Sequence, residues 1–260
     1  MKLIKVENER YTYYETLLMK RNELEKEAQH IYYEYIRKFG DILCENFKLK
    51  IECIALKKSI AYCVMKQNKG EPILKHQMHQ YVQLRMEHYY EELEQMQLQN
   101  DASKKASPIS TFEAKEIKRI FRKLAKQMHP DLTDVAHRYP EIMELFQQVL
   151  TAYKCNDYQA IKELEVLCQS ALQRLGVQTY HVEIEDIDAK IENLEQEIDQ
   201  IVSELPYTYK YLLDDEDACE DKLQSLKQEQ ETYLQYRSDL QKQLDTWKDD
   251  IYDQTSSWLS

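Results

Sequence analysis

Apolar residues recur at intervals of three and four along most of the chain, the spacing that places side chains on one face of an α-helix. This pattern predicts three helices in the N-terminal third, over residues 8–38, 41–68 and 72–99. We expect Gly40 to end the first of them and Pro72 to open the third. Residues 51–54 also fit a short strand, but no partner strand is evident, so a helical bundle is the expectation.

Two amphipathic helices are predicted in the middle of the chain. The first lies within residues 111–128, with Ser110 or Thr111 as its cap. Its apolar face holds Ile117, Ile120, Phe121, Leu124 and Met128, and its other face holds Lys115, Lys118, Arg119, Arg122, Lys123 and Lys126. The second begins at Pro140, and its apolar stripe is Ile142, Leu145, Phe146, Val149, Ala152 and Tyr153. A further segment, residues 158–175, is expected to support this hairpin.

The tripeptide His129-Pro130-Asp131 follows the cationic helix. Pro130 lacks an amide hydrogen and disfavours helical geometry at the residue before it, so the helix must end there. We therefore expect the imidazole of His129 and the carboxylate of Asp131 to be displayed to solvent at the helix end.

The C-terminal arm carries two heptad seams. The first runs through Ile184, Ile187, Ile191, Leu194, Ile198, Ile201 and Leu205, and the second through Cys219, Leu223, Leu226, Gln230, Tyr233, Arg237, Leu240, Leu244, Trp247 and Ile251. Because a break at Pro206 separates them, the seams can fold back on each other as an antiparallel coiled coil. Alternatively, each seam can pair with a second copy of the chain to form a homodimer. The different compositions of the seams favour the hairpin.

The predicted fold is therefore all-α, with a central helical hairpin between an N-terminal helical bundle and a C-terminal antiparallel coiled coil. The expected divisions are an N-terminal helical region (1–100), a linker (101–110), the hairpin domain (111–175) and the coiled-coil arm (176–253). The composition agrees with long helices, because only 3 glycines and 5 prolines accompany 32% charged residues.

Charge is spread unevenly over a chain of net charge −12. Residues 183–253 hold 22 acidic and 7 basic side chains, whereas residues 115–126 hold six basic and one acidic. A compact basic face in an acidic protein is typical of a docking surface, and the overall sign disfavours nucleic acid. No apolar run is long enough for a membrane span or a secretory signal, which predicts a cytoplasmic protein. The scattered cysteines and histidines offer no metal site, and no cofactor is expected.

The segment from Ile117 through Ile120-Phe121-Arg122-Lys123-Leu124-Ala125-Lys126 to His129-Pro130-Asp131, followed by Phe146 and Ala152-Tyr153, closely resembles the second and third helices of a J domain. J domains are the modules by which DnaJ-type co-chaperones engage DnaK-type chaperones. The resemblance covers residues 113–157. The tripeptide alone is a weak signal, but its place between a basic helix and a Phe…Ala-Tyr helix makes the pattern specific.

The resemblance implies that this protein binds a DnaK-type chaperone and stimulates its ATP hydrolysis. The trigger would be the His129-Pro130-Asp131 turn, and the docking surface would be the basic face of Lys118, Arg122 and Lys123, flanked by Arg119 and Lys126. The helical arms would bind a protein client or localise the co-chaperone. By this interpretation the protein is not an enzyme.

The chain departs from the usual J-domain pattern in several places. A J domain normally opens with a Tyr-Tyr-x-x-Leu-like helix shortly before the basic helix, whereas Tyr89 to Leu93 lies far upstream. The first helix is therefore absent, separated by an insertion, or replaced by N-terminal packing. No Gly/Phe-rich or zinc-binding region follows, so the resemblance is to a divergent member. The iron-sulfur assembly co-chaperone also joins a J domain to a helical bundle, but with the J domain at its N-terminus.

Three other interpretations of the tripeptide remain open at this point. It could be a simple helix stop, although that does not account for the basic face and the following helix. His129 and Asp131 could form an acid–base pair, but no nucleophile or phosphate loop accompanies them. The chief alternative is a coiled-coil scaffold or adaptor with a vestigial J-like segment.

Overall fold

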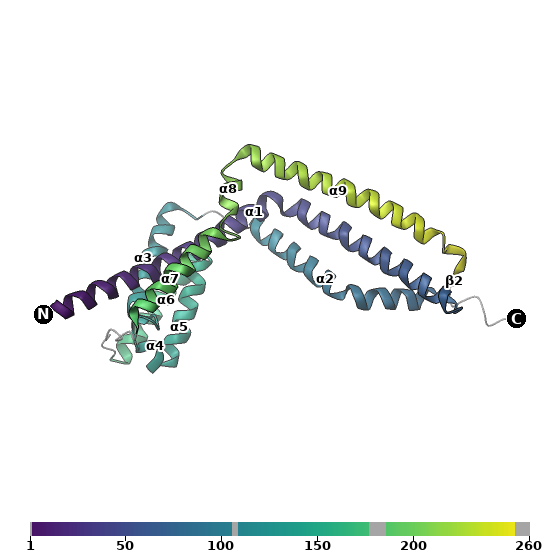
Figure 1. Cartoon of the computed structure of the whole chain (residues 1–260). Helices are drawn as coiled ribbons and strands as arrows, with labels where there is room; N and C mark the ends of the chain where they lie inside the picture. The colour runs from purple at the N-terminus through teal and green to yellow at the C-terminus, as the bar shows by residue number, and fades with distance from the viewer. Residues whose placement is uncertain (1, 106–108, 177–185, 253–260) are drawn as a thin grey trace. The chain divides into compact units, whose positions relative to one another are not determined.

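The computed structural model describes residues 2–105, 109–176 and 186–252, and it confirms the all-α fold (Figure 1). The helices are α1 (Lys2–Asn68), α2 (Lys75–Lys105), α3 (Thr111–Met128), α4 (Val135–Arg138), α5 (Pro140–Lys154), α6 (Tyr158–Arg174), α7 (Ile187–Ser203), α8 (Tyr209–Leu213) and α9 (Glu216–Asp245), with a 3₁₀ turn η1 (Lys248–Asp250). The two short strands are β1 (Ile73–Leu74) and β2 (Ile251–Tyr252), which pair in parallel.

The chain forms two compact units that do not follow its linear order. The first comprises Met1–Tyr32 and Ser107–Tyr209, and the second comprises Tyr33–Ala106 and Lys210–Ser260. This division differs from the expected sequence of N-terminal region, linker, hairpin domain and arm. The reason is that α1 contributes its first part to the core of the first unit and its later part to the second.

The core of the first unit is built from α1, α3, α4, α5, α6 and α7. Its buried side chains come from every one of these helices. They include Leu17 and Leu18, Ile120 and Leu124, Phe146 and Val149, Ile161 and Cys168, and Leu194 and Ile198. The predicted apolar stripes of α3 and α5 thus face one another, and α1 and α7 complete the core around them.

In the second unit α9 runs parallel to the later part of α1. Asn46 Nδ2 donates to the carbonyl oxygen of Leu226 at 2.9 Å, and Cys53 Sγ lies 3.7 Å from the carbonyl oxygen of Tyr233. Residue numbers rise together along the two helices, as parallel packing requires. At the far end Ile73 of β1 pairs with Ile251 of β2 beside a small cluster that includes Tyr62 and Met78.

Each heptad seam lies in a different unit, and the helix that carries it contacts a different stretch of α1. In the first unit Tyr13 Oη donates to Glu195 Oε1 at 2.6 Å, and Arg21 Nη1 lies 3.0 Å from Glu197 Oε2, so α7 also runs parallel to its stretch of α1. In the second unit Arg237, expected on the seam, is paired with Glu52. The expected antiparallel coiled coil is corrected accordingly. A heptad identifies the buried face of a helix but not the helix that covers it.

Gly40 does not end a helix, because α1 continues through it. A Cβ at this position would lie 2.3 Å from Oδ1 of Asn100 and 2.9 Å from its Cγ. The glycine therefore allows the side chain of Asn100 on α2 to approach the backbone of α1, where Nδ2 of that amide donates to Asp41 at 2.8 Å. The stop after α1 is instead at Gly70, whose φ is 65°.

Other local expectations are also revised. Residues 51–54 are helical within α1, and α2 begins at Lys75 after the β1 strand rather than at Pro72. The expected linker is helical as far as Lys105, while Ile184 of the first seam lies outside the described residues. None of the six cysteines is disulfide-bonded, and five of them are buried. Within the part of the chain that is described, no helix is long and apolar enough to cross a membrane.

Candidate functional site

A capping box fixes the start of α3. Ser110 Oγ accepts the backbone N–H of Glu113 at 3.1 Å, and the Glu113 carboxylate accepts the N–H of Ser110 at 2.9 Å. Ser110, rather than Thr111, is therefore the N-cap. These reciprocal bonds satisfy amide groups that the first turn leaves without helical partners. The register of α3, and with it the direction of each lysine and arginine, is set at this point.

Aromatic contacts hold α3 against α5. The rings of Phe121 and Tyr153 stack with centroids 3.9 Å apart and an interplanar angle of 15°. The ammonium group of Lys26 on α1 lies 4.1 Å from the centroid of the Tyr153 ring. Burial lowers the pKa of Lys26 to about 8 and raises that of Tyr153 to about 12. The apolar face of α3 is consequently committed to the core, as its sequence pattern predicts.

Proline terminates α3 as expected. His129 has φ −65° and ψ 126°, an extended conformation, while its N–H still donates to the carbonyl oxygen of Ala125. The N–H groups of Leu132 and Thr133 then donate to the carbonyl oxygen of His129 at 3.0 and 2.9 Å. His137 Nε2 lies 3.1 Å from the carbonyl oxygen of Pro130. The backbone of the turn is thus held by hydrogen bonds to the carbonyl oxygens of both His129 and Pro130.

The imidazole of His129 is buried, which corrects the expectation of an open side chain. It is only 4% exposed and meets the ring of Phe146 edge-on, with centroids 5.2 Å apart. Its Nδ1 accepts the N–H of Asp131 at 3.1 Å, which places the proton of the neutral ring on Nε2. Burial, partly opposed by the nearby Asp131 carboxylate, lowers the pKa of His129 to about 4. The ring is therefore neutral at physiological pH.

The beginning of α1 covers the turn. Tyr11 Oη donates to the carbonyl oxygen of Leu132 at 2.7 Å, and Tyr14 is 3% exposed. Burial raises the pKa of both phenols to about 12, and the negative charge of Asp131 contributes to that of Tyr14. Pro130 and Asp131 themselves remain partly exposed. The turn thus shows its proline and carboxylate to solvent while its imidazole faces inward.

Acidic side chains of α1 pair with the cations of α3. Glu23 accepts from Lys118 Nζ at 2.9 Å and also from Arg122, and Glu15 lies 2.6 Å from Lys126 Nζ. The three cationic side chains are 44%, 49% and 60% exposed. Two carboxylates therefore neutralise much of the face without removing it from solvent.

The other two cations of the predicted docking surface have different partners. Arg119 pairs with Glu116 one turn earlier at 3.0 Å, and Lys123 pairs with Glu165 of α6 at 2.9 Å. The structure therefore places all five predicted basic residues on one accessible side of α3. Each of them has an acidic partner within the first unit, which the sequence alone did not indicate.

The contribution of α1 to this site was missed at the sequence level. Residues 13–17 read Tyr-Tyr-Glu-Thr-Leu, the same Tyr-Tyr-x-x-Leu order noted at Tyr89 to Leu93. Tyr14 and Leu17 lie in the core with α3, whereas residues 89–93 lie in α2 of the second unit. The repeated pattern was the available signal, but its distance from α3 in the sequence concealed the contact.

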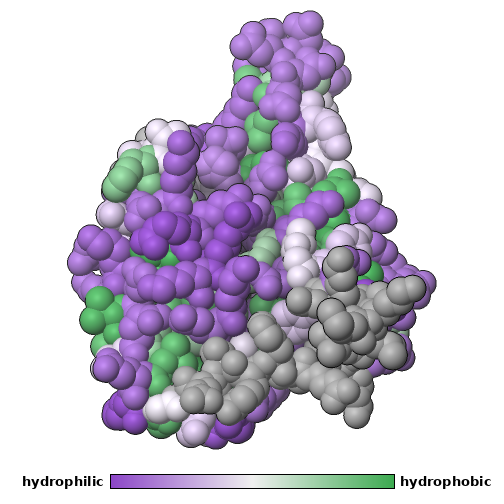
Figure 2. All heavy atoms as spheres, turned by 90° about the vertical axis from the view of Figure 1, so that its left-hand side faces the viewer, coloured by the Kyte–Doolittle hydropathy of each residue, from purple (hydrophilic) through white to green (hydrophobic). Residues whose placement is uncertain are grey.

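No protein-family model, curated protein or solved structure matches this chain. The site must therefore be judged on its own geometry. Figure 2 shows a face covered mainly by hydrophilic side chains, with apolar side chains in small separate patches. Recognition through charge is more consistent with such a face than recognition through an apolar groove.

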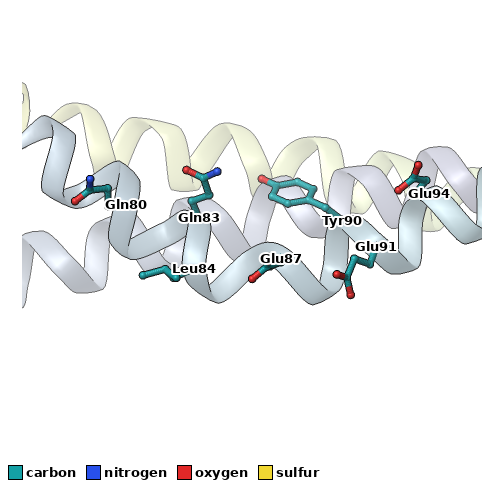
Figure 3. A pocket seen from close by; sticks show the side chains of 7 residues that line it. All are labelled: Gln80, Gln83, Leu84, Glu87, Tyr90, Glu91 and Glu94. Carbon is teal, nitrogen blue, oxygen red and sulfur yellow. The ribbon is translucent and has the colours of Figure 1, made fainter.

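Other hollows in the described regions carry no chemistry of comparable definition. Figure 3 shows one on α2, where Leu84 is 74% exposed. It is lined by Gln80, Gln83, Leu84, Glu87, Tyr90, Glu91 and Glu94. Across residues 2–105, 109–176 and 186–252, no three His, Cys, Asp or Glu side chains gather as metal ligands. The α3 face and its turn remain the best-defined candidate site.

Proposed function

We propose that this protein is a J-domain co-chaperone that binds a DnaK-type chaperone and stimulates its ATP hydrolysis. The observation that carries the proposal is the joining of a cationic helix face to a His-Pro-Asp turn of fixed geometry. A cationic face increases the rate of encounter with an acidic protein and orients it. The turn at the end of the same helix is then presented to the partner at a constant distance from that face.

The Tyr-Tyr-x-x-Leu segment of α1 supports the same proposal. A J domain opens with such a segment, and here Tyr14 and Leu17 pack in the core beside α3 and α5. On this interpretation the residues of the second unit that lie between Tyr33 and Ala106 are an insertion after the first helix of the domain. Of the alternatives left open for the first helix, this interpretation favours N-terminal packing, separated from α3 by a long insertion.

In the proposed mechanism the protein forms no covalent bond and performs no catalysis of its own. Pro130 and Asp131 contact the chaperone from the partly exposed turn, and the cations Lys118, Arg122 and Lys123 hold its acidic surface. The carboxylate of Asp131 accepts hydrogen bonds from the partner. His129 keeps this geometry by accepting the N–H of Asp131, so it acts as a positioning residue.

The burial of His129 favours one alternative, a scaffold in which the J-like segment is vestigial. Such a protein would use its long helices to join partners and would leave the chaperone cycle unchanged. The two functions differ in one measurable property, which is the rate of ATP hydrolysis by the chaperone.

The test is single-turnover ATP hydrolysis by the cognate DnaK-type chaperone with and without this protein. We expect the wild type to stimulate hydrolysis. Asp131→Asn and His129→Gln should each reduce this stimulation by a factor of about ten or more, because each variant removes a charged or orienting contact. Circular dichroism of each variant establishes that it is folded.

His79→Gln is the matched control, because it makes the same substitution at an exposed imidazole of α2, in the second unit and away from the tripeptide. It should retain most of the stimulation. If the wild type does not stimulate any DnaK-type chaperone of its cell, the co-chaperone proposal is wrong and the scaffold is favoured.

A further inference from the structure

The contacts between α1 and α3 follow one another along an antiparallel pair of helices. Glu23 meets Lys118 and Arg122 early in α3, Glu15 meets Lys126 near its end, and Tyr11 bonds the carbonyl oxygen of Leu132 beyond it. One segment of α1, residues 11–23, therefore contacts both parts of the proposed chaperone-binding site. We call it the masking segment.

We propose that the masking segment competes with the chaperone for the cationic face of α3. Glu15 and Glu23 occupy, within the chain, the same cations that an acidic partner surface would require. The protein is then held in a low-affinity state until the partner's carboxylates replace these two. This inference rests on the proposed function and adds a regulatory element to it.

The competition takes place through exchange of side-chain partners, not through detachment of α1. Leu17, Leu18 and Met19 are 5%, 0% and 7% exposed in the core, so removing the whole helix would expose a continuous apolar surface. In contrast, the cations of α3 remain about half exposed, and exposed ion pairs are weak. Their carboxylate partners can therefore be replaced while the core stays intact.

The masking segment also restricts the approach to the turn, where Pro130 and Asp131 are only partly exposed. Tyr11 is joined to the turn by the hydrogen bond to Leu132, and Tyr14 is buried beside it. Both residues precede Leu17, the first of the three apolar anchors. Fraying of α1 as far as Tyr11 would release the hydrogen bond to Leu132 and would leave Tyr14 and the three anchors in the core.

The main experiment measures chaperone stimulation by the full chain carrying Glu15→Gln and Glu23→Gln together. This variant keeps the shapes of both side chains and removes their charges. We expect the chaperone concentration for half-maximal stimulation to fall by about fivefold, in line with the energies of exposed ion pairs. The difference from the wild type should shrink as salt is raised, because screening weakens the competing pairs.

A matched control is available within the same unit. Glu25 pairs with Lys154 at 2.8 Å and Glu141 pairs with Arg174 at 2.8 Å, so Glu25→Gln combined with Glu141→Gln removes the same charge without touching α3. The control should behave as the wild type. Tyr11→Phe, which removes only the hydroxyl, tests the turn separately and should also increase stimulation at subsaturating chaperone.

The outcomes separate the two proposals. If the test variant and the control gain equally, the effect is one of net charge and the masking segment is not a competitor. If wild type and variants stimulate equally and His129→Gln still abolishes stimulation, the competition is disproved while the co-chaperone function stands. If none of them stimulates, the proposed function itself fails, and the regulatory inference fails with it.

Discussion

At the scale of single residues, His129 shows how a side chain expected to be displayed can be committed to the interior. Its ring lies against Phe146 and its Nδ1 accepts an N–H from the next turn, so the uncharged tautomer is the form that fits. The sequence could predict the helix stop, because Pro130 alone enforces it. It could not predict the burial, because this depends on packing against other helices, such as the contact with Phe146 of α5.

This burial predicts a specific dependence of stability on pH. The pKa of His129 is lowered from 6.5 to about 4 in the folded protein, chiefly by desolvation. As the pH falls below about 6.5, His129 becomes protonated in the unfolded chain but stays neutral in the folded chain. The free energy of unfolding therefore falls as the pH drops from about 6.5 towards 4. Above pH 6.5 the free energy of unfolding is not reduced by protonation of His129. Below pH 4 the ring is protonated in both states, so it causes no further loss of stability.

The measurement is urea unfolding of the wild type and of His129→Gln at pH 7 and pH 5. The wild type should lose about 2 kcal/mol more than the variant over this interval, from 1.36 kcal/mol per unit of pKa difference. His79→Gln, in which an exposed imidazole of α2 is replaced, should lose as much as the wild type. Equal losses in wild type and His129→Gln would show that the ring is accessible to protons in the folded state.

At the scale of elements, Gly40 fixes how closely α2 packs on α1. The sequence predicted a helix end at Gly40, because glycine is common just after the last residue of a helix. The structure instead uses its missing side chain to admit Asn100, whose amide also bonds Asp41. Local sequence cannot distinguish these two uses, since the deciding atom belongs to a residue sixty positions later.

We predict that Gly40→Ala destabilises the protein by up to about 2 kcal/mol. Helix propensity alone favours alanine by about 1 kcal/mol, but forcing a methyl group against a buried neighbour typically costs about 1–3 kcal/mol. The added Cβ would lie 2.3 Å from Oδ1 of Asn100, whose residue is 6% exposed, so the steric cost should dominate.

A double-mutant cycle with Asn100→Ala is the check, with stability measured by urea unfolding. In the Asn100→Ala background the obstruction is gone, so Gly40→Ala should become neutral or stabilising by up to about 1 kcal/mol. An additive cycle, with the same penalty in both backgrounds, would mean that Asn100 is not what Gly40 accommodates.

The elements themselves were largely predictable, whereas their partners were not. The apolar stripes of α3 and α5 were predicted correctly as buried faces, as Ile120 and Phe146 show. A hydrophobic period of 3.6 residues identifies the buried face of a helix directly. The seams of α7 and α9 were also identified as buried faces. Their common partner α1 was not predicted. A local pattern shows which face of a helix is buried, but not which other helix packs against that face.

At the scale of the whole molecule, the use of α1 as the common partner decides how many copies of the chain associate. Heptad seams often join separate chains, and a homodimer was one expected arrangement. Here Leu194 and Ile198 of α7 are each 4% exposed, and Leu226 and Leu240 of α9 are 4% and 5% exposed, within a single chain. These four seam positions are therefore already covered within one chain, whereas Leu205 at the end of the first seam is exposed.

We accordingly predict a monomer of 31.3 kDa, and sedimentation equilibrium at micromolar concentration should return that mass. The midpoint of urea unfolding should not change with protein concentration, because folding and association are not coupled in a monomer. Leu226→Ala should lower the unfolding free energy by about 2–5 kcal/mol, the usual cost of a cavity in a core, equally at all concentrations. If the seams instead joined two chains, the mass would double, the midpoint would rise with concentration, and Leu226→Ala would act by dissociating the dimer.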